Sequence, residues 1–241
     1  MSKKQILVFQ HLPIEHPGIF RDFMQRDAMN LHTVELDNGD TIPPLDRFDA
    51  LWVMGGPMDV WQEQEYPWLR DEKQAIRTAV NELGMPYLGI CLGHQLLAAA
   101  LGAEVGPGPA EVGVIPVQKT AAGKQNRFLA GLPVSMNTLQ WHSAEVKQVP
   151  DGCEVLASSA ACAIQALARG NQVLTMQYHQ EILATTVGDW SAIPEYSQAL
   201  ESSLGEGAVD RLAQDVNIAL PELNATAAVI YNNWRSAAFA E

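Results

Sequence analysis

The sequence predicts an α/β fold in which an open, mostly parallel sheet carries helices on both faces and gains added antiparallel strands. Strand-like and helix-like segments alternate through the first hundred residues, which is typical of parallel sheets. Several short strand-like segments then follow one another, which is typical of hairpins. Of the 241 residues, 47% are hydrophobic and 18% are charged, so the chain can bury a sizeable core.

The first half is expected to hold four strands and three helices. The strands are short runs of apolar or β-branched residues, at 5–10, 31–35, 48–54 and 86–90. The helices show apolar residues at helical spacing or good helix formers, at 18–26, 68–82 and 93–100. Gly84 and Gly102 follow the second and third of these helices, where glycine commonly ends a helix.

The second half is expected to add antiparallel hairpins and a helical tail. Strand-like segments separated by Gly, Pro, Asn or Asp lie at 111–119, 145–149, 154–159, 163–168 and 173–178. Helical segments follow at 195–204, 208–219 and 222–237. Because no linker or repeat interrupts the chain, we expect one domain over residues 1–241, with a core of about 1–190 and a helical C-terminal extension of about 191–241.

Charge and cysteine content exclude several classes of protein. The chain has 15 Lys and Arg against 28 Asp and Glu, so it lacks the basic field that binding to nucleic acid needs. It shows no signal peptide and no apolar run of about 18 residues, so no membrane span is expected. Cys91, Cys153 and Cys162 form neither a disulfide framework nor a C-x-x-C pair, which favours the reducing cytoplasm.

The clearest chemical signal is a G-x-C-x-G pattern at residues 89–93, where the fourth strand-like run meets a helix. It is the thiol counterpart of the G-x-S-x-G nucleophile elbow, a sharp turn that needs glycines around a strained nucleophile. The N-terminal end of the helix favours the thiolate of Cys91, and the backbone N–H of Leu92 is placed to bind an oxyanion. The alternative is that Cys91 is only a small buried apolar residue.

A cysteine nucleophile needs a base and a group that orients the base. His179 and Glu181 follow a strand-like run, and residues two apart on an extended segment face the same side. They could form one base–orienter pair at the carboxyl edge of the sheet, where open α/β folds bind ligands. The alternative is an exposed loop histidine beside a solvated glutamate. The other histidines show no ligand spacing, so neither a metal site nor a cofactor is expected.

Taken together, these residues resemble the class I, or triad-type, glutamine amidotransferases, and in particular the stand-alone members called GMP-synthase-like. The resemblance extends to about residue 185 and implies a flavodoxin-like sheet with a Cys–His–Glu triad. The segments that carry it are 54–60 (MGGPMDV), 65–69 (EYPWL), 87–102 (YLGICLGHQLLAAALG), 139–143 (LQWHS) and 156–162 (LASSAAC).

The resemblance implies a catalytic role for each matching residue. Cys91 would attack the side-chain amide of glutamine and form a γ-glutamyl thioester. His179 would take the thiol proton and give it to the leaving ammonia, and Glu181 would hold the imidazole in the useful tautomer. Backbone N–H groups of Gly56 and Leu92 would form the oxyanion hole, although Gly56 could instead belong to a simple strand-ending turn.

The resemblance also implies how the substrate is held. Gln95 would help to hold glutamine, and Trp141, His142 and Ser143 would contact its α-amino acid end through their backbone. Gln95 could instead face solvent, and Trp141 could serve only in packing. His94 lies three residues after Cys91, but we prefer His179 as the base because the family pattern supplies no base at the elbow.

The sequence departs from the family pattern at three places. The family usually has His-Pro-Glu at the base, where this chain has Gln180 between His179 and Glu181. Relatives usually carry Asp at the position of Ala144, and the stretch 111–114 (EVGV) lacks a tryptophan that the family pattern has. These departures concern the geometry of the base and the specificity for glutamine.

Three functions are therefore weighed. The first is an amidotransferase-like hydrolase that releases ammonia. The ammonia would serve a separate synthetase subunit, because the chain has no G-x-x-x-x-G-K-[ST] loop and its tail is too short for an ATP-binding domain. The second is a γ-glutamyl peptide or amide hydrolase with the same thioester chemistry. The third is a non-catalytic binding protein on the same fold, against which the retention of Cys91, His179 and Glu181 argues.

Overall fold

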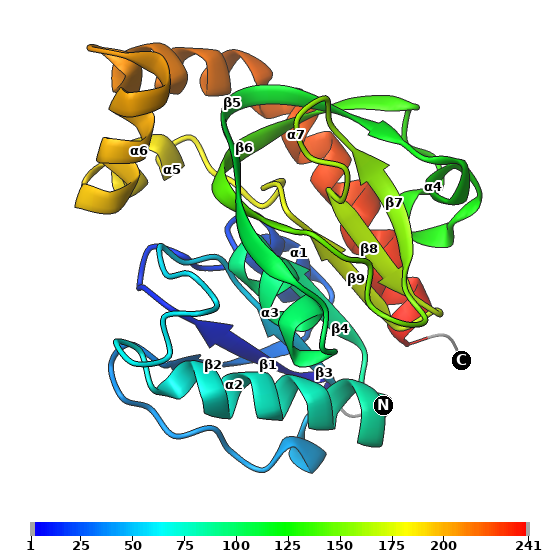
Figure 1. Cartoon of the computed structure of the whole chain (residues 1–241). Coiled ribbons are helices and arrows are strands. Elements are labelled where there is room, and N and C mark those ends of the chain that lie inside the picture. Colours follow the sequence, from blue (N-terminus) through cyan, green and yellow to red (C-terminus); the bar gives the residue numbers. More distant parts are fainter. Residues whose placement is uncertain (1–2, 240–241) are drawn as a thin grey trace.

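The computed structural model of the chain describes residues 3–239, so two residues at each end of the predicted domain lie outside the described residues. Within that range nine strands form one sheet, in the order β2-β1-β3-β4-β9-β8-β7-β5-β6 (Figure 1). The first five pair in parallel: β2 (Asn30–Glu35), β1 (Gln5–Gln10), β3 (Ala50–Val53), β4 (Tyr87–Ile90) and β9 (Val173–Met176). The other four extend the sheet by antiparallel pairing: β8 (Ala166–Arg169), β7 (Glu154–Ser158), β5 (Val105–Lys119) and β6 (Ser135–Val146).

The parallel half has the strand order of flavodoxin-like sheets, with β9 as the fifth parallel strand. The predicted fold class is therefore confirmed, including its added antiparallel strands. In such a sheet the carboxyl ends of the parallel strands share one edge, where ligands bind. Cys91 directly follows β4 and His179 follows β9, so both belong to that edge.

Helices cover both faces of the parallel half because successive strand residues point to opposite sides. Ile6 and Val8 of β1 lie in one hydrophobic cluster with α1 (Phe20–Arg26) and the C-terminal half of α7 (Ala208–Ala238). Leu7 and Phe9 lie in a second cluster with α2 (Trp68–Arg77) and α3 (Leu92–Ala100). A π-helical segment, Thr78–Glu82, continues α2 to the end predicted for that helix.

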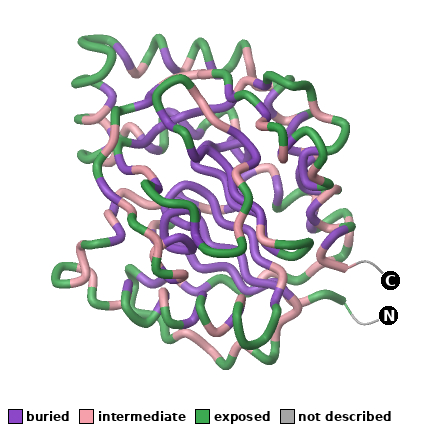
Figure 2. The backbone as a smooth tube through the Cα atoms, turned by 45° about the vertical axis from the view of Figure 1, so that its right-hand side comes forward, coloured by how far each residue is buried: buried purple, intermediate pink, exposed green. Residues whose placement is uncertain are grey.

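The most deeply buried elements are the short central strands. Every residue of β3, β4 and β9 is buried, and the burial colouring in Figure 2 shows these strands running through the centre of the molecule. Strands buried on both faces need continuous apolar runs rather than alternation. This is why the runs at 48–54, 86–90 and 173–178 are recognisable in the sequence.

The antiparallel half differs from the prediction at its longest hairpin. A strand was expected at 145–149, but the structure has β6 at Ser135–Val146, paired along most of its length with β5. The prediction was wrong because β6 buries polar side chains, among them Thr138 and Gln140, and so shows no apolar run. The short helices α4 (Ala121–Gln125) and α5 (Thr186–Ser191), and single 3-10 turns at Leu45–Arg47 and Arg127–Leu129, were not predicted.

The tail differs in a second way. Helices were expected at 208–219 and 222–237, on either side of Pro221, but α7 runs unbroken through this proline. Pro221 removes one intrahelical hydrogen bond, which usually ends or kinks a helix. Here Pro221 is exposed, so water can reach the freed carbonyl, while Val216 and Leu223 on the buried side hold the helix in place.

A third hydrophobic cluster covers the carboxyl edge of the sheet. It joins β6, α5, α6 (Pro194–Leu204) and the N-terminal half of α7 through Trp141, Trp190, Tyr196 and Leu212. None of the helices in residues 3–239 combines the length and apolar character that crossing a bilayer requires.

Candidate active site

The backbone turns sharply at Cys91, between β4 and α3. Cys91 has φ 50° and ψ −102°, a conformation that residues other than glycine rarely adopt. A Cβ atom on Gly89 would lie 2.6 Å from the carbonyl oxygen of Gly93, and one on Gly93 would lie 2.1 Å from that of Val53. The two glycines of the G-x-C-x-G pattern are therefore required by close backbone packing around the turn.

His179 and Glu181 form a buried pair next to this turn. Nδ1 of His179 lies 2.6 Å from Oε1 of Glu181. Burial disfavours the imidazolium, but the negative charges of the Glu181 carboxylate and of a Cys91 thiolate outweigh it and raise the pKa of His179 well above its usual value. Because Nδ1 faces Glu181, Nε2 is the ring nitrogen left for Cys91. The structure thus brings the three predicted triad side chains together.

Gly56 and Leu92 also lie at the thiol. A Cβ atom on Gly56 would lie 3.0 Å from Cδ2 of Leu92, so the two residues are in close contact. Gly56 and Cys91 line the same pocket. The N–H of Gly93 donates to the carbonyl oxygen of Met54 at 3.1 Å, so the next N–H of the elbow is already used.

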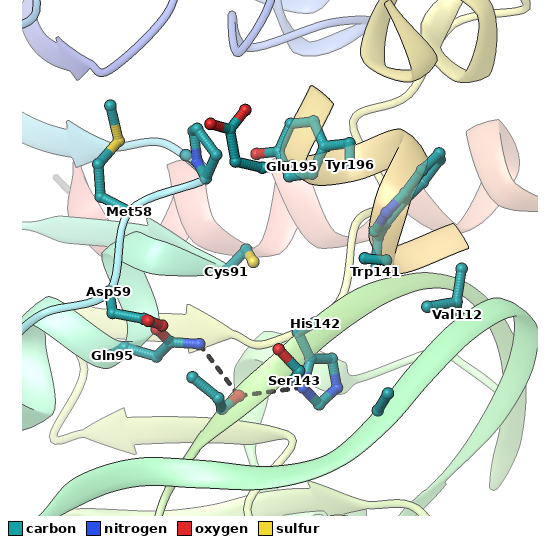
Figure 3. A pocket seen from close by; sticks show the side chains of 15 residues that line it. Met58, Asp59, Cys91, Gln95, Val112, Trp141, His142, Ser143, Glu195 and Tyr196 are labelled. Atoms are coloured by element: carbon teal, nitrogen blue, oxygen red, sulfur yellow. Dashed lines mark hydrogen bonds between the residues drawn. The ribbon is translucent and has the colours of Figure 1, made fainter. Parts of the chain in front are cut away.

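An open pocket lies beside Cys91 (Figure 3). Its walls come from five parts of the chain: the turn at 56–59, the start of α3, residues 110–112 of β5, residues 141–144 of β6, and α6. Glu195 and Tyr196 of α6 line the pocket above Cys91 in the view of Figure 3, and Trp141 lines it to the right. Within residues 3–239, no group of three or more His, Cys, Asp or Glu side chains is arranged to hold a metal ion.

The residues predicted to bind substrate all line this pocket. Gln95 is buried rather than solvent-facing, and its side-chain amide donates to the carbonyl oxygen of Ala144 at 3.2 Å (Figure 3). Nδ1 of His142 lies 3.0 Å from the same oxygen, and its Nε2 lies 3.3 Å from Glu111. Ser143 is exposed. Gln95 and His142 therefore fix the backbone at Ala144.

Trp141 lines the pocket and also packs against two other aromatic rings. Its ring meets Trp190 edge-on, with ring centroids 5.7 Å apart, and lies 5.8 Å from the ring of Tyr196. Trp190 in turn packs edge-on against His179 at 4.6 Å. This aromatic cluster links the pocket wall to the buried imidazole, so both interpretations of Trp141 describe part of its surroundings.

The family model described as glutamine amidotransferase class-I matches residues 18–190. The chain belongs to the class I glutamine amidotransferase family.

Relatives support this assignment. This chain is 32% identical over 182 residues to a glutamine amidotransferase-like protein, YfeJ, of Salmonella typhimurium, covering 73% of this chain and 75% of YfeJ. It is 37% identical over 124 residues to the glutamine-hydrolyzing GMP synthase subunit of Methanocaldococcus jannaschii, covering 51% of this chain and 64% of that protein. A solved glutamine amidotransferase of Methylobacillus flagellatus superposes with a TM-score of 0.88 at 27% identity, covering 100% of this chain and 97% of that one.

In this chain Gln180, the residue between His179 and Glu181, adds two hydrogen bonds. The N–H of Gln180 donates to Oε2 of Glu181 at 2.9 Å, and its side-chain amide donates to the carbonyl oxygen of Asn137 at 2.8 Å. Proline, the usual family residue here, has no N–H to donate. Glu181 is therefore held at one oxygen by His179 and at the other by the backbone of Gln180.

His94 meets a different partner, on β9. Its Nδ1 lies 2.7 Å from the hydroxyl of Thr175 on β9. Burial, together with His142, lowers the pKa of His94 to about 3, so the ring stays neutral. These surroundings agree with the preference for His179 as the base.

Three residues that the sequence did not predict also lie at this site. The side-chain amide of Gln177 lies 3.6 Å from Sγ of Cys91. The hydroxyl of Tyr196 donates to the buried carboxylate of Glu15, and burial raises the pKa of both groups. Gln177 could have been found, because it precedes His179 by two residues and so faces the same side of an extended segment. No local pattern marks Glu15 or Tyr196.

Proposed function

We propose that this amidotransferase hydrolyses the side-chain amide of glutamine through a thioester on Cys91, giving glutamate and ammonia. The observation that carries the proposal is the meeting of the Cys91 thiol, the His179 imidazole and the Glu181 carboxylate at the carboxyl edge of the sheet. A strained nucleophile, a base and an orienting acid are the set that acyl transfer through cysteine requires.

In the first half-reaction, Nε2 of His179 takes the proton of Sγ while Sγ attacks the amide carbon of glutamine. The backbone N–H groups of Gly56 and Leu92 bind the oxyanion of the tetrahedral intermediate. The C–N bond then breaks, and the amine leaves as ammonia with the proton from His179. The raised pKa of His179 suits a base that must hold this proton between the two steps.

In the second half-reaction, water attacks the thioester and gives its proton to His179. The C–S bond breaks, glutamate leaves, and Sγ recovers a proton. Glu181 keeps Nδ1 of His179 protonated throughout, so that Nε2 is free to exchange protons with sulfur, nitrogen and water.

We assign substrate binding to the pocket beside Cys91. The backbone of 141–143 contacts the α-amino acid end of glutamine, and Gln95 holds the adjoining carbonyl of Ala144 in place. Two carboxylates also line this pocket, Asp59 and Glu195. They can receive the α-ammonium group, for which Ala144 offers no side-chain partner.

A second candidate function is the hydrolysis of γ-glutamyl amides or peptides. It is favoured by Ala144, which replaces the usual aspartate, and by Asp59 and Glu195, which offer negative charge to a cationic leaving amine. The covalent steps are the same, with an amine in place of ammonia. A binding protein without catalysis has less support, since the thiol, imidazole and carboxylate are all present.

A separate synthetase subunit is the partner that we propose for the ammonia. The support comes from the Methanocaldococcus jannaschii relative, which is named as one subunit of the GMP synthase. The three cysteines are unpaired, and we propose the reducing cytoplasm as the setting.

The test is a substrate panel for the purified protein. Glutamate release is measured from glutamine and from γ-glutamyl amides and peptides, with and without candidate synthetase subunits. We expect release from at least glutamine, and loss of at least a thousand-fold in kcat for Cys91→Ala, because the substitution removes the nucleophile. Equal rates for the two proteins would contradict the proposal, and cleavage of γ-glutamyl amides alone would favour the second candidate.

A further inference from the structure

A buried ion pair lies directly behind the glycine turn of the pocket. His11 follows β1, and its Nε2 lies 2.9 Å from Oε1 of Glu72, a residue of α2. Both side chains are 0% exposed, and the imidazole stacks on Trp68 with ring centroids 5.5 Å apart. The other ring nitrogen, Nδ1, lies 2.7 Å from the carbonyl oxygen of Gly55. No step of the proposed reaction uses this pair directly.

The imidazole of His11 must donate from both nitrogens. Its two partners are a carboxylate oxygen and a backbone carbonyl oxygen, and both only accept when Glu72 is ionised. Burial disfavours the charged ring, but the Glu72 carboxylate and the Gly55 carbonyl outweigh it and raise the pKa of His11. The Nδ1–H of His11 therefore donates a hydrogen bond to the carbonyl oxygen of Gly55.

That hydrogen bond fixes the orientation of one peptide group. The carbonyl of Gly55 and the N–H of Gly56 belong to the same peptide, and no peptide bond in residues 3–239 is cis. In a trans peptide the C=O and N–H point in opposite directions. Because His11 holds the carbonyl of Gly55, the N–H of Gly56 points away from His11. Gly56 lines the pocket together with Cys91.

Local sterics alone do not fix this peptide. Glycine flanks it on both sides, so no Cβ atom restricts its rotation. A side chain on Gly56 cannot do so, because its Cβ atom would lie 2.9 Å from Cβ of His11, and a Cβ atom on Gly55 would have to displace Oε2 of Glu15, 2.6 Å away. The crowded turn needs both glycines, and its orientation then depends on the hydrogen bond from His11.

We propose that His11, held by Glu72, is a positioning residue that keeps the N–H of Gly56 aimed at the oxyanion of the reaction. This inference rests on the proposed function, because the donor matters only when an oxyanion forms. The donating imidazole also polarises the peptide, which strengthens its N–H as a donor. Glu72 acts through His11 and touches no reacting atom.

Two substitutions separate the two hydrogen bonds of His11. In His11→Asn, the side-chain amide nitrogen can occupy the place of Nδ1 and donate to the carbonyl of Gly55. In His11→Gln, the longer side chain reaches toward Glu72 and leaves the carbonyl of Gly55 without its donor. For the substrate that the wild type cleaves fastest, we expect His11→Gln to lower kcat about 100-fold, with KM changed less than about threefold. We expect His11→Asn to keep kcat within about tenfold of the wild-type value.

Alkylation of Cys91 by iodoacetamide is the control readout. It needs the thiolate and its histidine but forms no oxyanion, since sulfur only displaces iodide. We expect its rate to be the same within about twofold in wild type and variants. A parallel fall of kcat and alkylation would overturn the inference, because the effect would then lie in the thiol or in the fold. Equal kcat values for His11→Asn and His11→Gln would overturn it as well.

A double variant covers the case in which His11→Gln does not fold. His11→Phe/Glu72→Leu replaces the buried pair with apolar side chains, an exchange that buried ion pairs often tolerate. It too removes the donor to Gly55, so kcat should fall about 100-fold. A folded double variant with wild-type kcat would refute the role of His11. A wild type that cleaves no member of the substrate panel would instead refute the proposed function, and this inference with it.

Discussion

Two buried histidines near Cys91 have pKa values that are shifted in opposite directions. His179 lies beside Glu181 and Cys91, and the negative charges of the carboxylate and of a thiolate raise its pKa despite burial. His94 faces the hydroxyl of Thr175 and has no carboxylate beside it, so burial and His142 lower its pKa to about 3. The neighbouring charges, and not the distance along the chain from Cys91, decide which ring can carry a proton.

His94 should make the folded protein sensitive to acid. An unfolded histidine titrates near pH 6.5, so between about pH 6.5 and pH 3 the unfolded chain binds a proton that the folded chain does not. Stability therefore falls as the pH is lowered through this window. From pH 7 to pH 5, we expect the wild type to lose about 2 kcal/mol more unfolding free energy than His94→Gln. Urea denaturation at both pH values measures this, and equal losses would contradict it.

The sequence was most informative about residues whose function is encoded locally. Cys91 was found through its flanking glycines, and His179 and Glu181 through their spacing on an extended segment. Glu15 and His11 were not found, because they reach the site only through the position of β1 in the sheet. Both follow a parallel strand at its carboxyl end, and only the folded order of the strands shows which other residues they meet.

At the scale of elements, α7 connects two hydrophobic clusters. Its N-terminal half packs through Leu212 and Val216 into the cluster that covers the site. Its C-terminal half places Trp234 in the core of the parallel sheet, edge-on to Trp52 at 5.0 Å, with the indole N–H donating to the carbonyl oxygen of Tyr87 at 3.2 Å. The helix that follows the predicted core thus contributes to that core.

Removal of the Trp234 side chain should lower the stability of the folded protein. Trp234 is 0% exposed, and we expect Trp234→Ala to lower the free energy of unfolding by about 3–5 kcal/mol, because it removes a large buried ring and leaves a cavity. Ile218 of the same helix is 74% exposed, and Ile218→Ala should change stability by less than about 0.5 kcal/mol. Urea denaturation followed by circular dichroism compares the two. A loss for Trp234→Ala no larger than that for Ile218→Ala would show that α7 is not part of the core.

Elements differed in how far the sequence revealed them. Strands β1, β3 and β4 are continuous apolar runs, and α3 begins at the elbow and ends next to a glycine, so periodicity and composition were enough. Strand β6 buries Gln140, whose side-chain amide donates to Gln165 at 3.0 Å. A polar residue can be buried when a distant partner satisfies it, and that partner is not visible in a local pattern.

At the scale of the whole molecule, the site is assembled from both halves of the sheet and from the helical tail. The loops after β1, β3, β4 and β9 supply His11, Gly56, Cys91 and His179 at one edge. The antiparallel half contributes the pocket wall on β6, and the helical tail contributes Tyr196 on α6. A site of this kind exists only in the folded chain, so its chemistry also reports on the fold.

The most direct test of the account is covalent labelling of the folded protein by 6-diazo-5-oxo-norleucine, a glutamine analogue that carries an electrophile. Intact mass and peptide mapping would locate the label. We predict a single label on Cys91, none on Cys153 or Cys162, slower labelling in the presence of glutamine, and no label on Cys91→Ala. A folded protein that leaves Cys91 unmodified, or that is labelled equally after Cys91→Ala, would contradict the assignment of Cys91 as the nucleophile of a glutamine-type amidohydrolase.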